Sequence, residues 1–242
     1  MSAEFDGLVA VVTGGASGIG LHTATVLVER GATVACLDLK VDGVVPPLHG
    51  IQADVTDDAS VSAAIEEVVT RLGRIDILVN NAGIGAQGDV SVNGDAEWHR
   101  VYDVNVVGIV RVSRAALPHL RKSPSPRIVN IASTEALGAT ALHSPYSAAK
   151  AGVTGLTRSL AVELGRDGIT VNCICPGPIT TGITERISDE HKVIFAKRRT
   201  VLRRYGDPEE VAHMTLSLCL PAASYITGAV IPVDGGLMAR NA

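Results

Sequence analysis

Residues 8–31, LVAVVTGGASGIGLHTATVLVERG, indicate the fold most strongly. The first part, LVAVVTGG (8–15), is a short run rich in β-branched residues that ends in glycines, which is typical of a buried strand. From Gly18 onward the apolar residues follow helical spacing until the chain reaches Gly31. The sequence therefore predicts a strand, a tight glycine-rich loop and a helix, in that order.

The rest of the chain repeats this alternation. Further strands are predicted at 33–38, 50–54, 75–80, 126–133, 169–177 and 229–236, and further helices at 57–73, 95–121, 145–165 and 208–218. Apolar strands that alternate with helices form βαβ units and a parallel sheet covered on both faces. We therefore predict an α/β protein with one doubly wound Rossmann domain over 1–242, built on a seven-stranded, mostly parallel sheet.

Two segments do not follow the regular pattern. Residues 39–49 contain two prolines and no helical period, so we expect a loop there instead of a full crossover helix. Residues 178–206 are rich in Thr and Arg and form the longest irregular stretch. Long excursions from a regular domain are usually lids or binding loops, so we expect 178–206 to cover the substrate.

Composition limits the classes of function. Apolar residues make up 46% of the chain and the net charge is only −4, with no long run of like charge, so we expect no nucleic-acid or membrane partner. The N-terminus lacks the basic start and long apolar run of a signal peptide. The four cysteines show no CxxC spacing and no histidine–acid cluster is present, so we expect buried thiols, a reducing cytoplasmic setting and no metal site.

The glycine-rich segment TGGASGIG (13–20) lies where a parallel sheet binds phosphate. Gly14, Gly18 and Gly20 would allow a sharp turn, a close approach of pyrophosphate and tight packing of the helix on the sheet. The spacing G-x-x-x-G-x-G differs from the common G-x-G-x-x-G fingerprint, so a glycine turn without a ligand is the alternative. The position between a strand and a helix favours a nucleotide.

Asp38 indicates which nucleotide is bound. It ends the second strand 18 residues after Gly20, close to the spacing at which an acid binds the adenosine ribose hydroxyls. A carboxylate there would repel a 2′-phosphate, which favours NAD over NADP. An ordinary turn residue is the alternative, and Lys40, two positions further on, weakens the discrimination.

The segment VNNAGIG (79–85) follows the fourth predicted strand. In a doubly wound sheet that strand emerges beside the first one, at the switch point where ligands bind. The small residues Ala82, Gly83 and Gly85 would keep this crevice open, although an isolated NNAG could also be simple turn chemistry.

Three motifs now stand in order along the chain: TGGASGIG (13–20), NNAG (80–83) and YSAAK (146–150). Together they resemble the short-chain dehydrogenase/reductase family in its short, single-domain form, over nearly the whole chain. Ser133 precedes Tyr146 by 13 residues, as the catalytic serine of that family does. NVVG (105–108), PGPITT (176–181) and DGG (234–236) are similar to its active-site asparagine motif, its nicotinamide-side segment and the end of its last strand.

The resemblance implies hydride exchange between a nicotinamide cofactor and a secondary alcohol or ketone. It implies catalytic roles for Asn105, Ser133, Tyr146 and Lys150. The cofactor contacts that we predict are Gly14, Ser17, Gly18, Ile19, Gly20, Asp38, Asp54, Val55, Asn81, Ala82, Gly83, Tyr146, Lys150, Pro176, Gly177, Ile179 and Thr181. The shortened 39–49 crossover departs from the family pattern and affects the wall of the adenine pocket.

The stretch PYSAAK (145–150) supplies the predicted acid–base chemistry. On a helix, positions i and i+4 share one face, so Lys150 would lie near Tyr146 and its positive charge would favour the phenolate. Ser144 is a suitable cap and Pro145 suits the first helical position, which would place Tyr146 in the first turn. An isolated pair of this kind would more often be solvated, but Ser133 and the glycine loop favour the catalytic interpretation.

Substrate identity is less evident from the sequence. Glu135 and His143 lie near Ser133 and Tyr146 and are predicted to line the substrate cavity, which favours a hydroxylated or polar substrate; a surface position for His143 is the alternative. The resemblance also implies a homotetramer. Small and apolar residues on more than one face of 148–165 fit a helix that is buried twice.

The sequence is also compatible with two rival functions. The pattern is also similar to a 3-oxoacyl carrier protein reductase, for which KRRTVLRR (197–204) would supply a basic docking surface, although Asp38 disfavours the phosphorylated cofactor. The second rival is a non-catalytic NAD-binding sensor or scaffold. Loss of Tyr146 or Lys150 would have indicated that outcome, and both residues are present.

Overall fold

The computed structural model describes residues 4–185 and 187–240, without the side chain of Ile183. Residues 1–3, Arg186 and 241–242, which include both ends of the predicted domain and one position of the predicted lid, lie outside the described residues. The strands are β1 (Val9–Thr13), β2 (Thr33–Asp38), β3 (His49–Gln52), β4 (Ile77–Asn80), β5 (Arg127–Ile131), β6 (Thr170–Pro176) and β7 (Val230–Val233). The α-helices are α1 (Gly18–Glu29), α2 (Asp58–Leu72), α3 (Asp95–Tyr102), α4 (Gly108–Leu120), α5 (Ser144–Leu164), α6 (Asp189–Arg199) and α7 (Pro208–Cys219).

The strands form one seven-stranded sheet in the order β3-β2-β1-β4-β5-β6-β7, and every pairing is parallel. This confirms the doubly wound Rossmann-type sheet. The order reverses between β1 and β4, where Thr13 pairs with Asn80. The carboxyl ends of β1 and β4 therefore open side by side, which is where ligands bind in such sheets.

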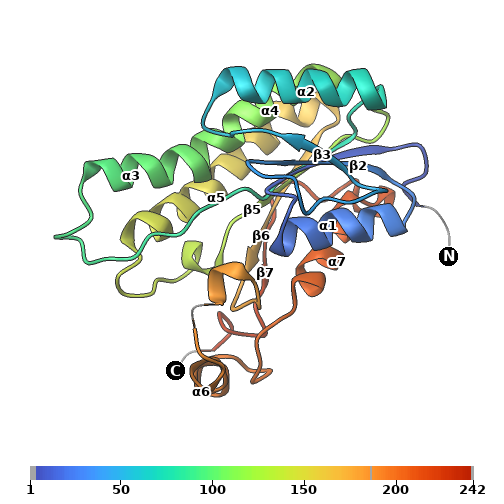
Figure 1. Cartoon of the computed structure of the whole chain (residues 1–242). Helices are drawn as coiled ribbons and strands as arrows, with labels where there is room; N and C mark the ends of the chain where they lie inside the picture. Colours follow the sequence, from blue (N-terminus) through green and yellow to red (C-terminus); the bar gives the residue numbers. More distant parts are fainter. Residues whose placement is uncertain (1–3, 186, 241–242) are drawn as a thin grey trace.

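Helices cover both faces of the sheet (Figure 1). On one face α1 and α7 bury Leu27 and Val211 against strand residues such as Val12 and Val79. On the other face α2, α4 and α5 contribute Ile65 and other side chains to a second apolar cluster. Strands buried on both sides must be apolar almost throughout, which is why they appear in the sequence as continuous β-branched runs.

The loop between β2 and β3 contains no helix, as predicted, but three other expectations need correction. Residues 178–206 are not irregular throughout, because they contain α6, which begins after the Ser188 cap and stands apart from both helical layers at the bottom of Figure 1. The predicted helix 95–121 is interrupted by a π-helical turn, η1 (Asp103–Val107). Helix α5 begins at Ser144 with His143 as its N-cap, so Ser144 is not the cap.

Among the described residues, no helix is both long enough and apolar enough to span a membrane. The same residues contain no group of three or more His, Cys, Asp or Glu side chains placed to hold a metal ion. The four cysteines are buried free thiols.

Candidate active site

The glycine-rich loop lies between the end of β1 and the start of α1. Gly14 and Gly18 have φ values of +62° and +51°, in the left-handed region that disfavours other residues. The Asn81 Nδ2 atom donates hydrogen bonds of 3.0 Å to both the Thr13 and Gly14 carbonyl oxygens, which fixes the loop to the end of β4. Ser17 is the N-cap of α1 but makes no side-chain capping bond. The loop and the helix N-terminus are thus suited to bind a phosphate.

A cavity of about 430 Å³ extends from this loop along the ends of β1, β2 and β4. Asp38 lies in its wall, where its Oδ2 accepts a hydrogen bond from Ala16 N at 3.1 Å and its Oδ1 accepts one from Leu39 N at 2.8 Å. A carboxylate can accept about four hydrogen bonds, so acceptor capacity remains for a ligand. The other predicted cofactor residues in this wall are Gly14, Ser17, Gly18, Ile19, Val55, Asn81, Ala82, Gly83 and Thr181.

Two predicted cofactor residues, Gly20 and Asp54, line neither this cavity nor the second cavity described below. Gly20 packs directly on the loop, because a Cβ atom there would collide with the Gly14 carbonyl oxygen. The Asp54 carboxylate instead accepts hydrogen bonds from Thr56 N at 2.8 Å and Thr56 Oγ1 at 2.6 Å, and these bonds lower the pKa of Asp54. Both residues shape the loops around the cavity.

Ser133, Tyr146 and Lys150 meet in a second cavity of about 140 Å³. Ser133 follows β5 and caps a 3₁₀ turn, η2 (Thr134–Ala136), by accepting a hydrogen bond from Glu135 N at 3.1 Å. Tyr146 lies in the first turn of α5, and the Lys150 Nζ atom lies 5.7 Å from the centroid of its ring. Three residues distant in the sequence are therefore brought together. Pro176, Gly177 and Ile179 complete the predicted set in this wall.

The electrostatics of the pair differ from the expectation based on spacing. Burial raises the pKa of Tyr146, a hydrogen bond with Ser133 opposes that rise, and the charge of Glu135 adds to it. Burial also lowers the pKa of Lys150 to about 8. The Lys150 Nζ atom donates a 2.8 Å hydrogen bond to the Ile131 carbonyl oxygen. Burial thus favours the protonated phenol, which can donate a hydrogen bond.

Asn105 lies in the π-helical turn η1 and is fully buried. Its Nδ2 atom donates hydrogen bonds of 2.9 Å to the Ile84 and Val101 carbonyl oxygens, while its Oδ1 atom has no partner among the described residues. A Cβ atom on Gly83 would lie 2.7 Å from that oxygen and 3.3 Å from Lys150 Nζ. Asn105 and Lys150 therefore converge at Gly83, where a larger side chain would not fit.

A third cavity, of about 840 Å³, opens on the other side of Ser133 and Tyr146. Glu135 and His143, the two residues predicted to contact substrate, both line it. However, the Glu135 carboxylate already accepts hydrogen bonds from Thr140 N at 2.9 Å, Thr140 Oγ1 at 2.5 Å and Ser147 Oγ at 2.7 Å. The sequence missed the wall formed by α6, which contributes His191, Ile194, Phe195, Arg198 and Arg199.

The three cavities form a series. Ile19, Asn81, Gly83 and Thr181 line both the first and the second cavity. Ser133, Tyr146, Gly177 and Thr184 line both the second and the third. The Ser133–Tyr146–Lys150 cavity is thus the junction between a glycine-lined cavity and a large, open one.

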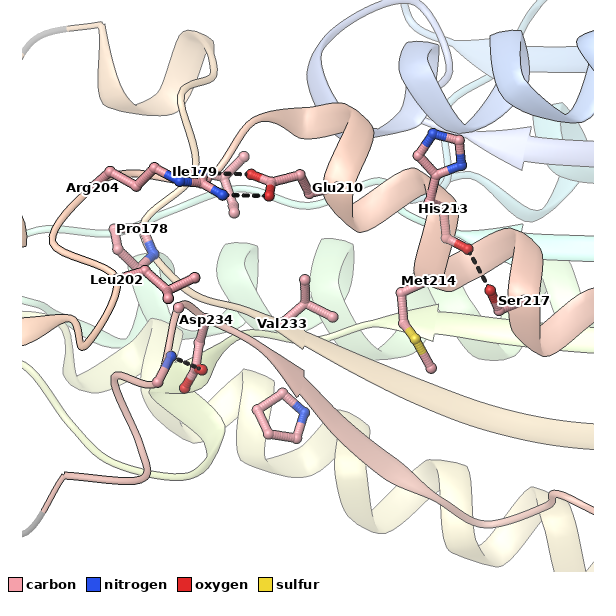
Figure 2. A pocket seen from close by; sticks show the side chains of 14 residues that line it. Pro178, Ile179, Leu202, Arg204, Glu210, His213, Met214, Ser217, Val233 and Asp234 are labelled. Carbon is pink, nitrogen blue, oxygen red and sulfur yellow. Dashed lines mark hydrogen bonds and ion pairs between the residues drawn. The ribbon is translucent and has the colours of Figure 1, made fainter.

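Figure 2 shows a further cavity, of about 580 Å³, between α7 and β7. Met214 and Val233 line it, and Arg204 donates two hydrogen bonds of 2.6 Å to Glu210 at its edge. Pro178 and Ile179 form one wall, but Ser133, Tyr146 and Lys150 do not contribute to it. It shares Ile179 with the second cavity and Pro178 with the third, but it lies to one side of the Ser133–Tyr146–Lys150 group.

Comparison with known proteins identifies the class of this site. A family model described as Enoyl-(Acyl carrier protein) reductase matches residues 14–238. The chain is 37% identical to the 3-oxoacyl-[acyl-carrier-protein] reductase FabG of Thermotoga maritima, covering 97% of this chain and 99% of that relative. It is 39% identical to the meso-2,3-butanediol dehydrogenase of Serratia marcescens, with 98% and 97% covered.

A solved structure agrees with these relatives. The aldohexose dehydrogenase of Thermoplasma acidophilum, in its ligand-free form, matches with a TM-score of 0.94 and 33% identity, covering 99% of this chain and 97% of that chain. All three named proteins are dehydrogenases or reductases, and each matches nearly the full length of this chain. This chain therefore belongs to the short-chain dehydrogenase/reductase family and is a nicotinamide-dependent oxidoreductase that acts on CH–OH groups.

Proposed function

We propose that this protein interconverts a secondary alcohol and the matching ketone, with NAD as the cofactor. The observation that carries the proposal is the series of cavities, in which Ser133, Tyr146 and Lys150 lie at the junction. A nucleotide in the glycine-lined cavity and an alcohol in the open cavity would meet at the Tyr146 hydroxyl. Proximity of this kind removes much of the entropic barrier to a reaction between two molecules.

The chain's own residues then have distinct roles. Tyr146 exchanges a proton with the substrate oxygen, and Ser133 donates a hydrogen bond that stabilises negative charge on that oxygen. Lys150 supplies a positive charge beside the phenol and binds the nicotinamide ribose. The unpartnered Asn105 Oδ1 atom binds a water that connects Lys150 to solvent. A bound nicotinamide would supply the acceptor or donor for the hydride of the substrate carbon.

The described residues fit such a cofactor. The left-handed glycines and the N-terminus of α1 are suited to the pyrophosphate, and Asp38 has acceptor capacity for ribose hydroxyls. Val55, Ala82 and Gly83 would line the adenine and ribose side, and Pro176, Gly177, Ile179 and Thr181 the nicotinamide side. Asp54 and Gly20 would act through the loops that they hold. The 178–206 segment, which contains α6, would act as the lid over the substrate.

The preference for NAD rests on Asp38. A 2′-phosphate on the ribose would lie against a carboxylate that the Ala16 and Leu39 amides already hold in place. Juxtaposed like charges cost several kcal/mol, so we expect kcat/KM to be about 100-fold higher with NAD than with NADP. In Asp38→Asn this ratio should fall towards unity because the repulsion is removed. Initial rates with both cofactors measure it, and a wild-type preference for NADP would contradict the assignment.

A 3-oxoacyl carrier protein reductase is the second candidate. FabG of Thermotoga maritima is among the relatives, and the basic segment 197–204 offers a surface that an acidic carrier could bind. The test compares kcat/KM for two reactions: reduction of a 3-oxoacyl thioester with NADPH, and turnover of free alcohols or ketones with NAD. A higher kcat/KM for the thioester would favour this candidate.

We also propose an oligomeric state and a cellular location for the protein. We propose a homotetramer, because α5 leaves Val162 84% exposed and α4 leaves Val110 36% exposed, and because the edge strand β7 is only half-buried beside the cavity of Figure 2. Exposed apolar faces of this kind commonly mark subunit contacts. The four buried free thiols fit a reducing, cytoplasmic setting.

The direct test is turnover. Sugars, cyclic diols, steroids, aryl alcohols and acyl thioesters are assayed in both directions with NAD and NADP and their reduced forms. The proposal expects oxidation of at least one secondary alcohol, or reduction of its ketone. Nucleotide binding without turnover of any compound would instead favour a sensor or scaffold.

A further inference from the structure

Helix α6 turns one face towards the large cavity. His191, Ile194, Phe195, Arg198 and Arg199 line that cavity, and their spacing of three and four residues places them along one stripe of the helix. Ile194 and Phe195 are 40% and 37% exposed, so their apolar surface is open to an occupant of the cavity. The stripe therefore combines an apolar part with two cationic groups at the C-terminal end of the helix.

The charges in this cavity are not balanced by the protein. Arg198 and Arg199 are exposed, and within residues 4–185 and 187–240 neither guanidinium forms an ion pair. Glu135 lines the same cavity, but Thr140 and Ser147 occupy its carboxylate oxygens. The cavity that contains Ser133 and Tyr146 thus has an excess of positive charge.

We propose that the substrate is a secondary alcohol or ketone that carries an anionic group, a carboxylate or a phosphate, at the end of an apolar body. Arg198 and Arg199 bind the anion, while Ile194 and Phe195 contact the apolar body. This inference rests on the proposed function, because it places the reacting carbon at Ser133 and Tyr146. Guanidinium groups suit both anions, since they donate paired hydrogen bonds to two oxygens.

The neighbouring residue Lys197 provides an internal control. It lies on the same helix and is exposed, but it does not line the cavity. If anion binding depended only on the net charge of the helix, removing the charge of Lys197 or that of Arg198 would weaken it equally. A specific site would depend on Arg198 and Arg199 only.

The experiment uses four alcohols with one carbon skeleton that end in a carboxylate, a phosphate monoester, a carboxamide or a methyl group. Each is titrated calorimetrically into the protein saturated with reduced nicotinamide nucleotide, so that an alcohol binds without reacting. Turnover of the same four compounds is then measured with the oxidised nucleotide. The proteins are the wild type, Arg198→Ala/Arg199→Ala, Arg198→Lys and Lys197→Ala, with thermal unfolding recorded for each.

We expect the wild type to bind one of the two anionic compounds about 10- to 100-fold more tightly than the carboxamide, as for hydrogen bonds to charged groups. The double variant should lose that preference, Arg198→Lys should keep part of it, and Lys197→Ala should keep all of it. The anionic compound that binds more tightly then shows whether the anionic group of the substrate is a carboxylate or a phosphate.

Two results would overturn the inference. Equal affinity for charged and uncharged compounds would exclude the anion site, while turnover of any of them would leave the proposed function standing. A preference for an anion that persists in the folded double variant would place the site elsewhere. Conversely, a preference that depends on Arg198 and Arg199 without turnover of any compound would support the anion site and count against the oxidoreductase proposal for these substrates.

Discussion

Glu135 connects the two segments that carry the active site. Its backbone N–H donates to Ser133 Oγ at 3.1 Å, and its carboxylate accepts from Ser147, the residue after Tyr146, at 2.7 Å. Ser133 and the start of α5 are thus held in register by one residue, through its backbone N–H on one side and its carboxylate on the other. The negative charge of Glu135 raises the pKa of Tyr146, and Cys175 from β6 acts in the same direction. Glu135 is a positioning residue with an influence on proton exchange.

Replacing Glu135 by Gln should shift the pH dependence of alcohol oxidation. Oxidation needs the unprotonated phenol, so its rate rises as pH passes the pKa of Tyr146. The Glu135 charge raises that pKa, so removing the charge lowers it. We therefore expect the rising limb of kcat/KM against pH to move to lower pH in Glu135→Gln.

Ser147→Ala is the matched control for this shift. It removes one hydrogen bond to Glu135 but keeps the charge, so the rising limb should remain close to its wild-type position even if the rate falls. A rising limb that stays in place or moves to higher pH in Glu135→Gln would exclude an electrostatic effect of Glu135.

At the scale of residues, the order of the motifs predicted which side chains meet at the active site. It did not predict the hydrogen bonds that hold the neighbouring side chains. Ser133, Tyr146 and Lys150 were predicted to lie together, and they line one cavity. The bonds of Asp54 to Thr56 and of Glu135 to Thr140 depend on how short loops fold. Burial, which raises the pKa of Tyr146 and lowers that of Lys150, is a property of the tertiary structure. Helical spacing alone indicates only that the two groups are neighbours.

At the scale of elements, the contact between α1 and the glycine loop should depend on Gly20. A Cβ atom there would collide with the Gly14 carbonyl oxygen and lie 2.5 Å from Asn81 Nδ2. Because both contacts involve groups that hold the loop, we expect Gly20→Ala to lower the free energy of unfolding by about 1–3 kcal/mol and to weaken nucleotide binding. Urea unfolding and calorimetric titration of NAD measure the two effects.

Gly165→Ala is the control for Gly20→Ala. Gly165 has φ −58°, and a Cβ atom there would meet nothing within 4 Å. The free energy of unfolding of the Gly165→Ala protein should equal that of the wild type or exceed it slightly, and its NAD affinity should not change. If Gly20→Ala and Gly165→Ala had the same free energy of unfolding and the same NAD affinity, close packing at Gly20 would contribute to neither.

Hydrophobic periodicity predicted all seven strands but not every helix. The five inner strands, β2, β1, β4, β5 and β6, are largely buried and therefore appear as apolar runs, while the edge strands β3 and β7 are only partly buried. Helix α6 was not predicted because it is rich in charge and most of its residues are exposed, so its sequence has little apolar periodicity. The π-helical turn at 103–107 was missed because one extra residue in a turn leaves the apolar pattern of 95–121 almost unchanged. Both features lie next to the site.

At the scale of the molecule, the sheet order places the chemistry. The carboxyl ends of β1, β4, β5 and β6 lie at one edge of the sheet, so segments from positions 14, 81, 133 and 177 of the chain come together. The order of βαβ units in the sequence was sufficient to predict this convergence. The shape of the substrate cavity was not predictable, because it depends on where α6 lies relative to the sheet.

The central claim is that Tyr146 exchanges the proton in a reaction that requires the bound nucleotide. Tyr146→Phe tests it most directly, when turnover of the alcohol found by screening and calorimetric affinity for NAD are measured on the same preparation. Tyr102→Phe, on α3, is the control. We predict that Tyr146→Phe binds NAD within about threefold of the wild type but loses about 10²–10⁴-fold in kcat. Full turnover by Tyr146→Phe would contradict the account.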